Sequence, residues 1–135
     1  MNNRDIELLR LRPEIPSAKV SEKMSLEEQF QNKTLRPVIK LQNELFVEVF
    51  RNYIKKHKNS FHAYSVEKKL SFIENAIQRD IKFRNSLKGI VIGHFTIEEY
   101  LLYIENSSAL NKRMMNLVKE RMFSNIQLLE QELAY

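Results

Sequence analysis

Three stretches of the sequence repeat apolar residues at the three- and four-residue spacing of an α-helix. They cover residues 38–54, 66–87 and 110–133. This spacing puts the apolar side chains on one face of a helix, and that face must be buried against another element. The chain has two glycines and three prolines, too few for the many turns of a sandwich or barrel. The sequence therefore predicts an all-α fold.

Start and stop signals divide the chain between these stretches. Ser25 followed by Glu28, and Thr96 followed by Glu99, match the capping box that begins a helix. Gly89 is positioned to end a helix in the left-handed conformation. The expected helices are 26–32, 37–58, 66–88, 97–105 and 108–132. Three long and two short helices predict an antiparallel helical bundle.

The first 24 residues differ from the rest and form an N-terminal arm, extended or partly helical, ahead of a single domain over 25–135. Residues 5–11 suit one or two helical turns, whereas Pro13 and Pro16 favour an extended path. The arm is too apolar for a purely solvated tail. We expect it to dock on its own bundle, on a second copy of the chain or on a partner.

Positive charge is concentrated in the middle of the chain. The net charge is +5, and the excess lies within 34–94, whereas 95–135 is acidic. Many of these basic residues close a helix, where the helix dipole favours them. The same excess permits binding to nucleic acid, to a ribosome or to an acidic protein surface.

The corner after the third predicted helix carries the most site-like residues. Arg84 and Lys88 could bind a phosphate or carboxylate that Asn85 orients, or Asn85 could face Asn111 in a buried polar contact. His94 is a weaker candidate, four residues before a glutamate. Four further residues could line a ligand slot, but their helical spacing favours the core, and these are Tyr100, Tyr103, Met114 and Met115.

Several classes of protein find no support in the residues. There is no cysteine, no His-Glu-x-x-His pattern, no nucleophile motif and no nucleotide-binding glycine loop. We therefore predict no catalytic residue, no cofactor and no metal site. No signal peptide or membrane-spanning stretch is visible, so we expect a cytoplasmic protein that does not use a membrane.

Three runs of the chain, 30–43, 80–89 and 106–116, resemble a family of short all-helical bacterial proteins often labelled "glyoxalase". The resemblance covers roughly residues 30–125. That label implies a metal-dependent lyase built from βαβββ modules. This sequence departs from such modules because it lacks strand alternation and a matching set of His and Glu ligands. No catalytic residue is carried over.

Together these observations predict a non-enzymatic helical module that binds another macromolecule, either a protein partner or a second copy. The expected contact surfaces are the arm at 5–16 and the face near 84–88. The alternatives are a basic protein associated with nucleic acid or a ribosome, and the metal-dependent lyase that the resemblance implies.

Overall fold

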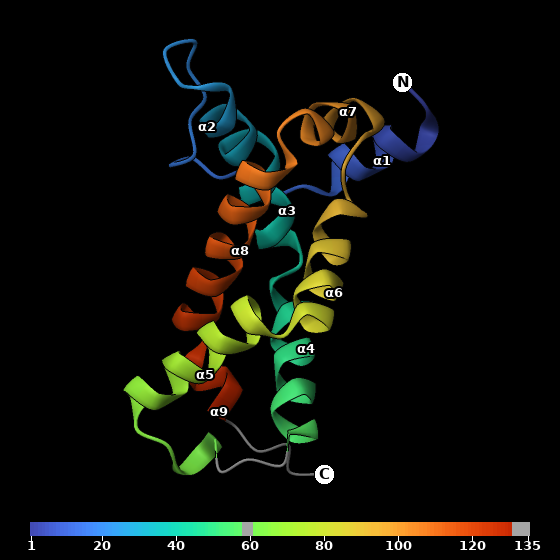
Figure 1. The fold of residues 1–135 in the computed structure, drawn as a ribbon. Coiled ribbons are helices and arrows are strands. Elements are labelled where there is room, and N and C mark those ends of the chain that lie inside the picture. Colours follow the sequence, from blue (N-terminus) through green and yellow to red (C-terminus); the bar gives the residue numbers. More distant parts are fainter. Residues whose placement is uncertain (58–60, 131–135) are drawn as a thin grey trace.

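The computed structural model describes residues 1–57 and 61–130, and over these ranges the chain is helical with no strand (Figure 1). The elements are α1 (Asn3–Leu11), α2 (Leu26–Phe30), the π-helix η1 (Gln31–Leu35), α3 (Arg36–Leu41), α4 (Asn43–Lys56), the 3₁₀-helix η2 (Phe61–Ala63), α5 (Val66–Arg79), α6 (Ile81–Ile92), α7 (Ile97–Glu105), α8 (Ser107–Ser124) and α9 (Ile126–Glu130). The all-α class is confirmed, and the antiparallel order stays a prediction. The expected helix ends at Lys58 and Glu132 lie outside the described residues.

Helix α8 lies at the centre of the fold and contacts η1, α3, α4, α5, α6 and α7. Its inward face is apolar along most of its length, as the spacing predicted. The buried residues are Leu110, Met114, Met115, Leu117, Val118 and Met122. They pack with the buried residues of α4, of which Phe46 and Phe50 are fully enclosed.

The three long helices that we predicted are each interrupted, at Gln42, Asp80 and Asn125. At Asp80 the cause is a cap: its carboxylate accepts a hydrogen bond from the backbone N–H of Phe83 at 3.2 Å and so begins α6. The other two breaks lie close together in space, and a hydrogen bond connects them: the Asn125 side chain donates to the Asn43 side chain at 2.7 Å.

Pro37 does not begin a new helix, although we expected one over 37–58. The chain stays helical from α2 to α3 and widens to a π-helix just before the proline. The Arg36 N–H donates five residues back, to the Gln31 carbonyl. A proline ring clashes with the carbonyl four residues before it. The wider turn removes that clash without ending the helix.

Gly89 does not end the third predicted helix. It lies inside α6, which continues to Ile92 and is capped by Gly93 in the right-handed conformation at φ −59°. The predicted left-handed stop is therefore wrong. A Cβ at Gly93 would lie 3.1 Å from the Gly89 carbonyl oxygen, a tight contact that favours glycine at this position.

Helices α1, α2 and α7 lie at the same end of the molecule, and α5 and α9 lie toward the other (Figure 1). The arm therefore reaches the corner between α6 and α7, which is distant in sequence. That end of the molecule carries the candidate site.

Candidate functional site

The corner between α6 and α7 brings two helix ends together. The carbonyl end of α6 is the negative end of its dipole, and the N–H end of α7 is positive. Thr96 caps α7 through the predicted capping box: its hydroxyl accepts from the Glu99 N–H at 3.2 Å, and the Glu99 carboxylate accepts from the Thr96 N–H at 2.8 Å.

Two arginines of the arm satisfy the carbonyl groups of this corner. Arg4 donates to the carbonyls of Phe95 and Gly93, both at 2.9 Å. Arg12 donates to the carbonyl of His94 at 2.9 Å. The arm therefore docks on its own chain, the first of the three possibilities. We call these contacts, with those of Asp5 and Glu99 described next, the arm clasp.

Two carboxylates complete the arm clasp on the α7 side. Asp5 is buried and accepts from the Ile97 N–H, the first of α7, at 3.1 Å. Glu99 accepts hydrogen bonds from both terminal nitrogens of Arg12, at 2.6 and 2.7 Å. The two side chains form a bidentate ion pair. Side chains of opposite charge thus lie at the helix ends that attract them.

Glu99 is ionised although it is buried. Burial raises its pKa, but the hydrogen bonds from Arg12, Thr96 and Thr34 outweigh that effect and hold the pKa below its ordinary value. The Thr34 hydroxyl, which lies in η1, donates to the Glu99 carboxylate at 2.7 Å. This one carboxylate therefore joins the arm, η1 and α7.

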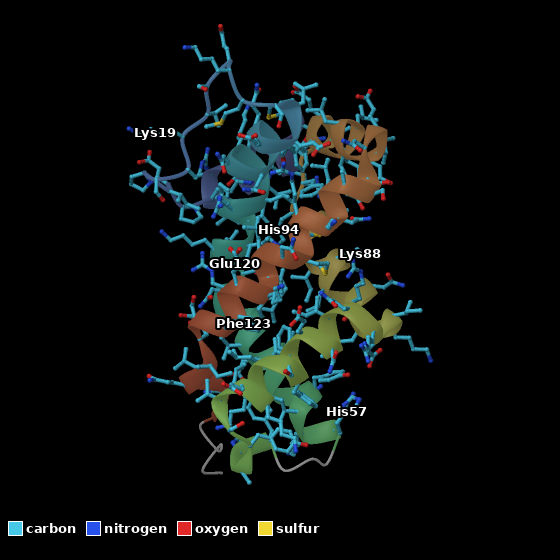
Figure 2. All side chains as sticks on the ribbon, turned by 60° about the vertical axis from the view of Figure 1, so that its left-hand side comes forward. Lys19, His57, Lys88, His94, Glu120 and Phe123 are labelled. Atoms are coloured by element: carbon cyan, nitrogen blue, oxygen red, sulfur yellow. The ribbon has the colours of Figure 1, made fainter. Side chains whose placement is uncertain are left out.

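The side chain of His94 sits among these cations. Its Nδ1 is buried and has no hydrogen-bond partner among the described residues. Burial lowers the pKa of His94, and the positive charges of Arg12 and Arg4 lower it further. Figure 2 shows His94 well separated from His57, which lies near the end of α4. His94 is therefore a neutral group packed against the arm clasp.

An apolar groove of about 320 Å³ opens beside the arm clasp, between α1, α2, α7 and the start of α8. Its apolar lining residues are Met1, Leu9, Leu26, Phe30, Leu102 and Leu110. Three of them stay largely in water, since Leu26 is 83%, Met1 75% and Leu102 51% exposed. Glu27, Glu98, Glu105 and Lys33 supply its charged groups outside the arm clasp.

Helix α7 presents most of its apolar residues to solvent. The residues that it buries are Glu99 and Tyr103. Those that it exposes include Ile97, Tyr100, Leu101, Leu102 and Ile104. A helix on the surface of a monomer ordinarily has the opposite arrangement. Contiguous exposed apolar surface on a folded chain marks a site of interaction.

The structure does not join the five predicted site residues into one site. Arg84 and Lys88 are half-buried on α6, and Asn85 on the same helix is exposed. Asn111 accepts a hydrogen bond from the Tyr103 hydroxyl instead of facing Asn85. Among the described residues, no hydrogen bond or ion pair connects any two of Arg84, Asn85, Lys88, His94 and Asn111.

Sequence analysis missed the groove, and it also missed Arg12 and Thr34 as partners of Glu99. Tyr103, Met114 and Met115 are buried as expected, but Tyr100 is 44% exposed, so its assignment to the core was wrong. One signal was available. The apolar residues of α7 include Ile97, Leu101, Leu102 and Ile104. Their positions around this nine-residue helix are spread more widely than one buried face can cover.

Other features of the described ranges add little to this site. An open hollow of about 530 Å³ lies beside Tyr53 and Asp80. Residues 1–57 and 61–130 hold no group of three His, Asp or Glu side chains placed to bind a metal ion. None of their helices has the length and apolar character needed to cross a membrane.

Comparison of the chain with protein-family models, curated proteins and solved structures finds no match. The resemblance to the family labelled "glyoxalase" therefore stays untested.

Proposed function

We propose that the protein is a module that binds another protein through the groove and the adjoining surface of α7. We call this surface the docking face, and it comprises Leu9, Leu26, Ile97, Tyr100, Leu101, Leu102 and Ile104. The observation that carries the proposal is the inverted arrangement of α7, which buries a glutamate and exposes its leucines.

The free energy available from burying these side chains in an interface supports the proposal. Fully burying one leucine or isoleucine side chain gains about 1.5–3 kcal/mol. Several such side chains on α7 and along the groove supply the apolar centre that protein interfaces use, while scattered exposed leucines elsewhere do not. The arm has a defined part in this function, because Leu9 and Met1 form one side of the groove and the arm clasp holds them there.

The test places a photo-crosslinking amino acid at Leu102 or, as a matched control, at Leu45 on α4. The two leucines are similarly exposed, at 51% and 46%. After irradiation in living cells we expect a discrete cross-linked protein from position 102 and none from position 45. Leu26→Glu should abolish the product. Equal products from both positions, or none from either, would refute the proposal. A product of twice the chain's own mass would identify the partner as a second copy.

A second candidate function is binding to nucleic acid or a ribosome. Two adjoining hollows of about 320 and 430 Å³ follow the contact of α3 with α8. Their cations include Arg36, Lys40, Lys112 and Arg121. If this surface binds the phosphate backbone, affinity for mixed RNA and DNA should fall steeply between low and moderate salt. Lys112→Glu with Arg121→Glu should then remove binding, and no binding at low salt would refute this candidate.

A further inference from the structure

The α7 side of the groove carries a regular alternation of charged and apolar groups. Glu98 and Glu105 are seven residues apart, with Leu102 between them. Seven residues make two helical turns, so the two carboxylates lie on the same side of α7, about 10.5 Å apart along its axis. All three residues line the groove.

The carboxylates of Glu98 and Glu105 have no hydrogen-bond partner in the part of the chain that the structure describes. Neither Glu98 nor Glu105 forms an ion pair among the described residues. Glu27 is different, because Asn106 donates to it at 2.8 Å and Arg113 lies 3.5 Å away. The polar groups deeper in the groove are also engaged, since the Thr34 and Thr96 side chains hydrogen-bond within the arm clasp. The groove therefore offers a partner an apolar surface, the two carboxylates of Glu98 and Glu105, and one cation, Lys33.

We propose, building on the protein-binding function above, that the occupant is an amphipathic helix with two basic residues seven positions apart. Its lysines or arginines pair with Glu98 and Glu105, and the apolar residue between them packs on Leu102. A helix laid in an apolar groove uses such regularly spaced anchors. Matched spacing on the two helices lets both ion pairs form at once.

Charge also disfavours a second copy as the occupant. In a two-fold symmetric contact the same surface of both copies meets. Glu98 and Glu105 of one copy would then approach those of the other, and unpaired like charges oppose such contacts. A basic helix of another protein has no such conflict.

Four synthetic helical peptides of 18 residues test the inference with the full chain. All share one apolar stripe. The first carries lysines seven apart beside that stripe, the second has glutamates there, the third has glutamines, and the fourth has its lysines five apart. Affinity is measured by fluorescence anisotropy. We expect the first peptide to bind about tenfold tighter than the second, because two ion pairs replace two like-charge contacts. The fourth should bind more weakly than the first.

Charge reversal locates the effect. Glu98→Lys with Glu105→Lys should invert the preference between the first two peptides. Glu44→Lys with Glu67→Lys is the matched control, because both glutamates are exposed in the first turn of a helix. It makes the same change in net charge and should leave the preference intact. If the reversed protein does not fold, Glu98→Gln with Glu105→Gln should abolish the preference without inverting it.

The outcomes separate this inference from the function on which it rests. Equal binding of the first three peptides, lost in Leu26→Glu, would keep the groove as a docking site and overturn the basic helix. An unchanged preference after charge reversal would also overturn it. If no peptide binds, the inference fails, and cross-linking at position 102 still decides the proposed function.

Discussion

The two ends of α6 are anchored by different kinds of contact. At its N-terminal end, aromatic rings pack around the corner at Asp80. The Tyr53 ring lies 4.1 Å from that of Phe83, and the Phe50 ring lies 5.1 Å from Phe83, centre to centre. At its C-terminal end, the arm clasp holds the corner through ion pairs and backbone hydrogen bonds.

The difference predicts two modes of failure. Substituting one aromatic residue lowers the stability in proportion to the apolar surface that it uncovers, and neighbouring rings can partly compensate. A buried ion pair fails abruptly, since removing one partner leaves the other charged, buried and unpaired. The end of the molecule that carries the docking face is therefore the more sensitive to a single substitution or to pH.

The largest expected effect is the loss of Arg12, whose side chain is 8% exposed. Arg12→Leu should lower the free energy of unfolding by about 3–5 kcal/mol, because Glu99 loses its counter-charge. Adding Glu99→Leu should restore part of the loss, since no lone charge remains. Urea denaturation measures both. Arg10→Leu is the control, because the Arg10–Glu7 pair is exposed. Equal losses for the two arginines would contradict the contrast between the ends.

A smaller loss is expected from Thr34→Val, which removes the hydroxyl that donates to Glu99 at 2.7 Å. Hydrogen bonds to charged groups contribute about 1.5–3 kcal/mol. Thr34→Ser keeps the hydroxyl and should retain most of that stability. If the serine variant loses as much as the valine variant, packing of the methyl group, not the hydrogen bond, is what matters there.

At the aromatic end, Tyr53→Phe should lower the free energy of unfolding by less than Thr34→Val does, because the rings stay packed and the 2.9 Å hydrogen bond that is lost goes to the partly exposed Asp80 carboxylate. Burial and then the Asp80 carboxylate raise the pKa of Tyr53 from 10.0 to about 12. The raised pKa contributes stability that is present below pH 10 and lost as pH rises toward 12. Asp80→Asn should reduce this alkaline loss in an absorbance titration. An unchanged titration would contradict the contact.

The smallest effect at neutral pH is expected from His94→Gln. The lowered pKa of His94 means that the unfolded chain takes up a proton first, so stability falls as pH drops below 6.5. The charged groups that act on His94 are Arg12 and Arg4. Glu99, whose pKa is lowered from 4.5, adds a second loss at more acidic pH. The variant should remove the first loss and keep the second, as thermal unfolding at graded pH would show.

Local signals in the sequence were sufficient for the helical class and for some of the helix starts. The caps at Ser25 and Thr96 are confirmed, because each depends on groups three residues apart. The break at Asp80 was hidden, since the apolar spacing continues from Ile77 to Leu87 across it. Aspartate at that position carried a capping signal that the spacing masked.

The candidate site was much less accessible to sequence reasoning. The Arg12–Glu99 pair spans 87 residues, and Thr34–Glu99 spans 65. Nothing within a helical turn of any of these residues specifies its partner. Glu99 was identified for its local capping role, and the long-range role became visible only with the arm in place. The exposed face of α7 could not be predicted for the same reason, because its exposure depends on which distant segments pack against the helix.

The π-helix ahead of Pro37 implies an unusual sensitivity to chain length. A π turn accommodates one residue more than an α turn, so η1 behaves like a single-residue insertion within a continuous helix. Deleting one residue from 31–35 would remove this insertion and leave ordinary α-helical spacing ahead of Pro37, where the proline ring would clash with the carbonyl four residues before it. Substitutions along η1 are thus better tolerated than a change in its length.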